Sequence, residues 1–225
     1  MKNIYILIPA FNPNEKLKIL INELRKQVSI ENILIINDGS TNGFDFSTLQ
    51  VKVISHNTNF GKGEALKNGL NYLINNYKNC KGIVTADCDL QHLPEDIIKI
   101  CNCLKNNPEK LILGSRFTHK NKIPLKSRVG NNVISFIMKH LYKISLIDTQ
   151  TGLRGIPANF VKEILNINNS DFSFETVMLL LAVKNNIHIE EVEINTIYYD
   201  NNSSTHFKPI KDSYKIMKNL IRGIK

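Results

Sequence analysis

The chain has 225 residues, of which 42% are hydrophobic and 22% are charged, and its formal net charge is +9. These proportions are ordinary for a globular protein, and this length is ample for one buried core. No apolar run approaches the roughly 20 residues of a membrane-spanning helix, and the first apolar run stops at Pro9, unlike a signal peptide. We therefore expect a cytoplasmic protein, and attachment to the inner face of a membrane stays open.

The positive charge is compatible with an anionic partner: nucleic acid, an anionic membrane surface or a phosphorylated substrate. A lysine-rich surface without a special partner explains the charge equally well. Nucleic acid is disfavoured, because the lysines are spread along the chain and no basic surface with interleaved aromatic side chains is visible. The four cysteines form no Cys-x-x-Cys pair and lie beside no histidine cluster, so we expect reduced packing residues.

Strand and helix patterns alternate over the first half of the chain. Apolar runs of strand length occur at residues 4–8, 33–36, 51–54, 82–86 and 111–113. Apolar residues at helical spacing occur between them, at residues 15–27, 61–77 and 95–104. Such alternation predicts right-handed βαβ units, and hence an α/β fold with a mostly parallel sheet flanked by helices. The polar loops after the strands would then line one edge of the sheet.

After Arg116 the pattern changes. Residues 126–146 predict a basic amphipathic helix that either covers the sheet or lies on a membrane surface, and packing within the protein is the more frequent outcome. The later elements are a polar turn at 148–155, helices at 158–165 and 174–185, a strand at 187–197, a polar loop at 199–206 and a basic amphipathic C-terminal helix at 209–224. Without a repeat or a linker, we expect a single domain over residues 1–225.

Two carboxylates, Asp87 and Asp89, follow the apolar strand at 82–86. In open α/β sheets, ligands bind at the carboxyl ends of the strands. Mg²⁺ typically takes one or two carboxylates together with substrate phosphates. We therefore expect Asp87 and Asp89 to hold a metal-bound diphosphate. An isolated Asp-x-Asp pair also occurs in helix caps and turns, so this interpretation depends on the rest of the chain.

Other polar side chains stand at comparable places. Asp38 follows the second strand, where a carboxylate is able to accept hydrogen bonds from a base or a ribose, although Asp-Gly-Ser is also a common turn sequence. Lys62 opens a helix and would approach a phosphate there, but the glycines around it lack the Walker A spacing. Arginine is the favoured fork for phosphate oxygens, which makes Arg116, Arg128 and Arg154 candidates, with salt bridges as the alternative.

Six motifs occur in an order that resembles one known family. They are Ile8-Pro9-Ala10-Phe11-Asn12, Asn37-Asp38-Gly39-Ser40, Asn59-Phe60-Gly61-Lys62-Gly63, Asp87-Cys88-Asp89-Leu90-Gln91-His92, Gly114-Ser115-Arg116 and Thr151-Gly152-Leu153-Arg154. The chain resembles the inverting glycosyltransferases of family 2, which have the Rossmann-like GT-A fold. Within that family it is most similar to the dolichyl- or polyprenyl-phosphate mannose and glucose synthases, over essentially the whole chain.

The resemblance implies roles for the matching residues. It implies that the nucleotide sugar is bound by Pro9, Ala10, Phe11, Asn12, Asp38, Gly39, Lys62, Asp87 and Cys88. It implies Mg²⁺ or Mn²⁺ on the diphosphate, held by Asp89 and Gln91. Arg116 and Arg128 would engage an acceptor phosphate, with Arg154 and Lys208 as further acceptor-binding residues. Residues 1–116 would form the nucleotide-sugar-binding part, and residues 117–225 the acceptor-binding part.

The chain departs from the family pattern in two places. Pro13 follows Asn12 where the family usually has glutamate, and the late loop at 199–208 holds no arginine, so Lys208 or Lys211 would have to substitute. The chain also has no tryptophan and therefore lacks the Gln-x-x-Arg-Trp signature of processive family 2 synthases. We therefore expect the transfer of a single sugar.

The acceptor in an inverting transfer attacks the anomeric carbon opposite the leaving diphosphate, whose charge the metal neutralises. A lipid phosphate needs no base, whereas a sugar hydroxyl needs a carboxylate such as Asp148 or Glu175. These two residues join Asp87 and Asp89 as candidate catalytic residues. The positive charge and the basic helices favour polyprenyl or dolichyl phosphate at an anionic membrane of the cell envelope. The alternatives are a hydroxyl of a surface polysaccharide or glycan, and a non-catalytic nucleotide-sugar-binding module.

Overall fold

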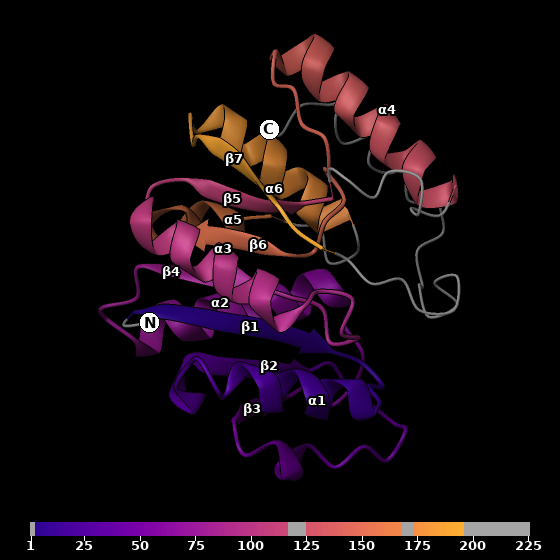
Figure 1. Ribbon diagram of the computed structural model, residues 1–225, viewed down its shortest axis with the longest axis vertical. Helices are drawn as coiled ribbons and strands as arrows, with labels where there is room; N and C mark the ends of the chain where they lie inside the picture. Colours follow the sequence, from indigo (N-terminus) through magenta and orange to yellow (C-terminus); the bar gives the residue numbers. More distant parts are fainter. Residues whose placement is uncertain (1–2, 117–124, 168–172, 196–225) are drawn as a thin grey trace.

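A seven-stranded sheet runs through the protein, in a computed structural model that describes residues 3–116, 125–167 and 173–195. The strand order is β3-β2-β1-β4-β6-β5-β7 (Figure 1). The strands are β1 (Ile4–Ala10), β2 (Ile33–Asn37), β3 (Lys52–Ser55), β4 (Gly82–Thr85), β5 (Leu111–Ser115), β6 (Arg154–Pro157) and β7 (Ile189–Glu193). Strand β6 runs antiparallel to both of its neighbours, and the other strand pairs are parallel. The predicted α/β fold with a mostly parallel sheet is confirmed.

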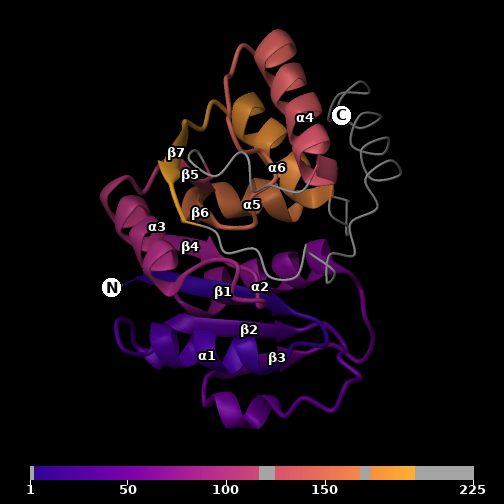
Figure 2. The same ribbon diagram turned by 45° about the vertical axis from the view of Figure 1, so that its right-hand side comes forward.

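Helices cover both faces of this sheet. One face packs against α1 (Glu15–Leu24) and α3 (Pro94–Asn106), and the other against α2 (Lys62–Asn76), α5 (Val161–Leu165) and α6 (Ser173–Lys184). The two layers are visible on either side of the strands in Figures 1 and 2. Each layer buries its own apolar cluster, because successive side chains of a strand point to opposite faces. In β1, for example, Leu7 enters the cluster under α2 while Ile6 and Ile8 enter the cluster under α1.

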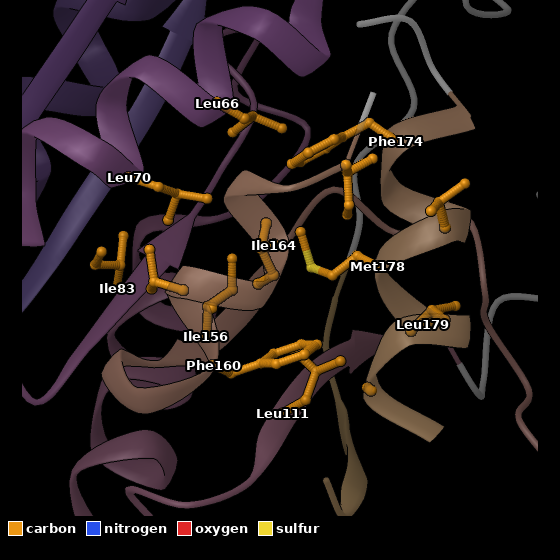
Figure 3. Close-up of a cluster of buried hydrophobic side chains, with 14 of the residues drawn as sticks. Leu66, Leu70, Ile83, Leu111, Ile156, Phe160, Ile164, Phe174, Met178 and Leu179 are labelled. Atoms are coloured by element: carbon orange, nitrogen blue, oxygen red, sulfur yellow. The ribbon is translucent and has the colours of Figure 1, made fainter. Parts of the chain in front are cut away.

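The cluster on the α2 side draws on segments far apart in the sequence. Figure 3 shows Leu70 of α2, Ile156 of β6 and Met178 of α6 converging with their neighbours. Fully burying one such side chain stabilises the fold by about 1.5–3 kcal/mol. This cluster holds α2 and α6 against the sheet, and both helices begin at the polar edge described below.

Strand β6 is an element that the sequence pattern does not reveal. A polar turn is predicted at 148–155, but its end forms the first half of β6, where Arg154 pairs with Thr85 and Gly155 with Val84. Arginine, glycine and proline do not favour strands, and four residues are too few to show an alternating pattern. The strand forms because both neighbours offer unpaired backbone groups in the middle of the sheet.

Helix α4 (Leu125–Tyr142) packs on the α6 side through Ile134 and Met138, which are both buried. Phe136 is 62% exposed. The helix ends before the predicted residue 146, and β7 is shorter than the predicted strand at 187–197. The polar loop at 199–206 and the C-terminal helix at 209–224 lie outside the described residues. Among the described helices, none combines the length and apolarity that crossing a membrane requires.

Helix α2 approaches β1 closely at Gly69, where a Cβ would lie 2.8 Å from Cδ2 of the buried Leu7. Alanine usually stabilises an exposed helix by about 1 kcal/mol relative to glycine. We expect the opposite for Gly69→Ala, a loss of about 1–3 kcal/mol in the free energy of unfolding, because the core is overpacked. Urea denaturation checks this value. Leu7→Ala should cost less in the Gly69→Ala background than in the wild type, and additive effects of the two changes would contradict the close contact.

Candidate active site

The loops after β1 and β2 are bound to each other at the carboxyl ends of the strands. The Asp38 backbone N–H donates to the Ala10 carbonyl at 2.8 Å. The Asn12 side-chain oxygen accepts from the Thr41 N–H at 2.7 Å, and the Asn12 N–H donates to the Ser40 hydroxyl at 2.9 Å. Parallel strands bring their carboxyl ends to one edge, and the predicted grouping of polar loops there is confirmed.

The first motif divides between core and surface. Pro9 and Ala10 are buried at the end of β1, so their side chains belong to the fold. Phe11 is 37% exposed, and Asn12 is exposed with a backbone φ of 48°. Of these four residues, only Phe11 and Asn12 present side chains at the edge of the sheet.

The Asp38 carboxylate is committed to the turn that precedes α2. Its oxygens accept from the N–H groups of Phe60 at 2.9 Å and Gly61 at 2.8 Å, and His56 Nδ1 lies 2.7 Å away. Asp38 is only 3% exposed. A direct contact of this carboxylate with a nucleoside stays a prediction that its burial does not favour. Gly39 is required beside it, since its φ is +70° and a Cβ would lie 2.6 Å from the Asn59 nitrogen.

Lys62 bridges two carboxylates from distant parts of the chain. It is the first residue of α2, and the φ of +96° at Gly61 directs the chain into that helix. Its Nζ lies 2.6 Å from Asp87 Oδ1 and 3.2 Å from Glu175 Oε1. Burial alone would lower the pKa of Lys62, but the two carboxylates raise it above its usual value. Lys62 is therefore a permanent cation that ties α2, β4 and α6 together at the edge of the sheet.

Asp87 has further neighbours, and its side chain is 32% exposed. Burial would raise its pKa, but Lys62 lowers it below the usual range, so Asp87 is ionised. Its backbone N–H donates to His92 Nδ1 at 3.2 Å, which places the proton of the neutral ring on Nε2, and burial lowers the pKa of His92 to about 4. A Cβ on Gly152 would lie 2.5 Å from Asp87 Oδ2. The Gly152 carbonyl accepts from the buried Thr85 hydroxyl at 2.9 Å, which holds this glycine against the carboxylate.

Asp89 offers the second carboxylate of the pair. Its Oδ1 accepts from the Gln91 N–H at 3.0 Å, across a turn in which Leu90 has a left-handed φ of 62°. Such backbone in a non-glycine residue is strained and often marks a functional site. Burial and the neighbouring Asp87 raise the pKa of Asp89, a situation that a bound cation relieves. Burial also raises the pKa of Cys88, to about 12, so its thiol is not a reactive group at neutral pH.

The residues at this edge fit a hard divalent cation only when a substrate supplies further ligands. In the part of the chain that the structure describes, no three His, Cys, Asp or Glu side chains form a complete metal cage. Two adjacent carboxylate groups, one already balanced by Lys62, suit Mg²⁺ or Mn²⁺ when phosphates of a substrate complete the coordination shell.

Arg116 and Asp148 form a two-pronged pair at the end of β5. Arg116 Nε donates to Asp148 Oδ2, and Arg116 Nη2 donates to Asp148 Oδ1 at 2.7 Å. Asp148 is 2% exposed. A buried carboxylate of this kind depends on its cation, because removing one partner leaves an uncompensated charge. The structure thus brings together one predicted acceptor-binding residue and one predicted base.

Arg154 is wholly buried inside the sheet. Its guanidinium donates to the backbone carbonyls of Thr149 at 3.1 Å, Thr151 at 2.9 Å and Glu175. These bonds connect the loop before β6 to the first turn of α6. The predicted contact of Arg154 with an acceptor is disfavoured by this burial, because the side chain is 0% exposed. Arg128 lies on α4 in a stretch whose side chains are not described, and Lys208 lies outside the described residues.

Two residues that matter to the site were not assigned a role from the sequence. Gly152 was part of a motif, but only the fold reveals that it faces Asp87. His56 follows β3 and meets Asp38 only because β2 and β3 pair in parallel. An aspartate after one strand and a histidine after the next strand of the same sheet is the sequence signal for this contact.

The mostly parallel sheet, the Asp-x-Asp turn after β4 and the helix that begins at Lys62 agree with the resemblance to the GT-A glycosyltransferases. Residues 5–165 match the Glycosyl transferase family 2 family, to which the chain therefore belongs. The chain is 32% identical over 222 residues to a UDP-N-acetylglucosamine–dolichyl-phosphate N-acetylglucosaminyltransferase of Methanococcus voltae, covering 88% of this chain and 86% of that protein. It is 24% identical over 249 residues to a dolichyl-phosphate beta-glucosyltransferase of Saccharomyces cerevisiae, covering 96% and 72%.

Solved structures confirm the fold. The structure of glucosyl-3-phosphoglycerate synthase from Mycobacterium tuberculosis with Mn²⁺, UDP and glucosyl-3-phosphoglycerate matches with a TM-score of 0.69. The two chains are 15% identical, and the match covers 98% of this chain and 79% of the other. At this identity the likeness concerns the fold.

Gly152→Ala should abolish transferase activity without unfolding the protein, because the added methyl group displaces the Asp87 carboxylate. Release of nucleoside diphosphate from nucleotide sugars measures the activity, and circular dichroism measures the fold. Gly155→Ala is the matched control: its Cβ would meet the apolar side chains of Ile100 at 3.1 Å and Ile112 at 3.2 Å. It should lower stability and leave the activity of the folded protein unchanged. Equal activity losses in the two variants would contradict the role of Gly152.

Proposed function

We propose that the protein is a metal-dependent inverting enzyme that moves one sugar from a UDP- or GDP-sugar to a polyprenyl or dolichyl phosphate. The observation that carries this proposal is that each candidate base already has a cationic partner. Arg116 holds Asp148, while Asp87 and Glu175 share Lys62. A carboxylate that is engaged by a cation has to leave that contact before it takes a proton from an acceptor. An acceptor that is already ionised suits such a site, whereas a sugar hydroxyl needs a base.

The donor is proposed to lie over the ends of β1, β2 and β4. Asp89 and Gln91 would hold Mg²⁺ or Mn²⁺, and the cation would neutralise the charge that develops on the leaving diphosphate. Lys62 would supply a second positive charge near the phosphates. It stands at the N-terminus of α2, where backbone N–H groups also favour anions. Phe11, which is 37% exposed, would cover the nucleoside base. Asp87 would orient the sugar.

The acceptor phosphate is proposed to meet Arg116 and Arg128. Asp148 accepts from two N–H groups of the Arg116 guanidinium, and phosphate oxygens would accept from other N–H groups of the same planar side chain. Lys208 would add a further contact from the late loop. Residues 1–116 would thus serve the donor and residues 117–225 the acceptor. The two relatives named above act on dolichyl phosphate by name, and the net charge of +9 supports work at an anionic membrane surface.

A thermal-shift panel of UDP- and GDP-sugars, each with and without Mn²⁺, tests the donor. Only a ligand that binds the native state raises its midpoint of unfolding. We expect one nucleotide class to stabilise the protein, and to do so only when Mn²⁺ is present. Equal midpoints for all nucleotide sugars in both conditions would contradict a donor site.

Asp89→Asn should remove metal-dependent turnover and the Mn²⁺-dependent thermal shift together, because the variant loses the negative charge that attracts the divalent cation. The fold should be retained, since Asp89 makes its hydrogen bond through an oxygen that asparagine keeps. Asp45→Asn is a control on an exposed turn, where the Asp45 carboxylate accepts from the Ser47 N–H. A wild-type Mn²⁺ response in Asp89→Asn would refute the metal-binding role.

Arg116→Lys keeps a cation beside Asp148 but loses the planar fork that matches phosphate. We expect the KM for a polyprenyl-phosphate acceptor to rise about tenfold, the equivalent of about 1.4 kcal/mol, with the KM for the donor unchanged. Arg25→Lys, on an exposed surface where Arg25 bonds Gln50, is the control. An unchanged acceptor KM in Arg116→Lys would overturn the assignment of the acceptor phosphate to Arg116.

A further inference from the structure

Glu191 of β7 makes a set of contacts that the proposed chemistry does not use. Its carboxylate accepts from the Ser115 hydroxyl at 2.8 Å and from the Asp148 N–H at 2.9 Å. It also accepts from the Ile147 N–H, at 3.0 Å to Oε1 and 2.9 Å to Oε2. Three donors from two separate segments therefore converge on one side chain.

Both segments lead directly to the Arg116–Asp148 pair. Ser115 precedes Arg116 at the end of β5, and Asp148 is the residue that Arg116 grips. Glu191 thus contacts the backbone of one partner and the neighbour of the other. It is placed for this by the parallel pairing of β5 and β7, in which Glu191 stands opposite Leu113.

A second side chain holds the same loop. Asn131 of α4 donates to the Ile147 carbonyl at 2.6 Å and accepts from the Thr149 N–H at 2.8 Å. Polar side chains from two elements, α4 and β7, therefore hold the loop at 147–149. Because this loop is held in place, Asp148 loses less conformational freedom when it binds Arg116 than it would in a loose loop.

The neighbouring Glu190 lies on the same strand, and its contacts can be compared with those of Glu191. Successive side chains of a strand point to opposite faces, so Glu190 points away from the site. It pairs with Lys110 at 2.9 Å, and both side chains are about one-third exposed, at 34% and 27%. An exposed pair of this kind contributes little to stability. The two adjacent glutamates therefore differ in their partners although they share chemistry and strand.

We propose that Glu191 is a positioning residue for the acceptor: it fixes the Asp148 loop and thereby the direction of the Arg116 guanidinium. The inference rests on the proposed function of Arg116 for its kinetic consequence. Without the carboxylate, two backbone N–H groups and one hydroxyl lose their partner, the loop relaxes, and the arginine points in several directions. An acceptor phosphate then has to order the arginine as it binds, which weakens acceptor binding and leaves donor binding unaffected.

Steady-state kinetics of the full chain with a polyprenyl phosphate and its donor test this consequence. Glu191→Ala should raise the acceptor KM about tenfold, as expected when a hydrogen-bonded group that orients the site is lost, while the donor KM stays within about twofold. Glu191→Gln keeps an oxygen within reach of both N–H groups and should restore the wild-type acceptor KM. Glu191→Asp keeps the charge but withdraws the oxygens by one methylene, so it should behave like Glu191→Ala. Glu190→Ala should match the wild type throughout.

The direction of Arg116 is measured without any acceptor by its Nε–H signal in a nitrogen–proton NMR spectrum. The signal is assigned by its absence from Arg116→Lys. In Glu191→Ala and Glu191→Asp we expect it to shift and to exchange with solvent at least about tenfold faster, because the ion pair with Asp148 opens more often. In Glu191→Gln and Glu190→Ala it should stay at the wild-type position. Glu191→Asp also supplies the result should Glu191→Ala not fold.

The two measurements separate the two proposals. An Arg116 signal that is unchanged in Glu191→Ala or Glu191→Asp overturns the positioning role, whatever happens to the acceptor KM. A wild-type acceptor KM in those variants, in an enzyme that uses polyprenyl phosphate, also overturns it. If the wild type does not transfer to polyprenyl phosphate while the Arg116 signal shifts as expected, the proposed acceptor is wrong and the positioning of Arg116 by Glu191 is supported.

Discussion

The ion pair between Lys62 and Asp87 is the interaction on which the active edge of this protein depends. Lys62 begins α2, Asp87 follows β4, and the second carboxylate on Lys62 comes from Glu175 in α6. The three elements are placed by apolar packing on one face of the sheet, and their ends meet where the sheet stops. A lysine enclosed in this way stays charged only because carboxylates face it. The ion pairs at the edge therefore depend on the apolar packing, because moving any of the three elements would separate the charges.

A second buried cation, Arg154, complements the first. Its guanidinium binds backbone carbonyls, including that of Glu175, while the Glu175 side chain faces Lys62. Glu175 is thus held by its backbone from β6 and by its side chain from α2. Buried carbonyls without a partner are costly, so Arg154 satisfies groups that a shorter or apolar side chain would leave unpaired. This explains how a strand as unfavourable in composition as β6 is tolerated in the middle of the sheet.

The sequence predicts the parts of this architecture that depend on local pattern. The apolar runs at β1, β2, β4 and β5 and the polar residues after them define the sheet and its functional edge, and the order of six motifs indicates the family. A sequence pattern does not show with which residue each charged side chain pairs. The Asp38 carboxylate accepts from the turn before α2, and the Arg154 guanidinium is buried against backbone carbonyls; neither set of partners is visible in the sequence. In the sequence, Glu190 and Glu191 look alike. Only the pairing of β7 with β5 shows that they have different partners.

The balance of charge at the edge bears on what it binds. Three carboxyl side chains, those of Asp87, Asp89 and Glu175, lie at this edge with the single cation Lys62, and Asp148 is paired with Arg116. A diphosphate alone would meet this excess of negative charge and be repelled, even with Lys62 present. The divalent cation proposed above would offset this excess if it arrived together with the diphosphate. On that proposal, metal and donor bind as one unit.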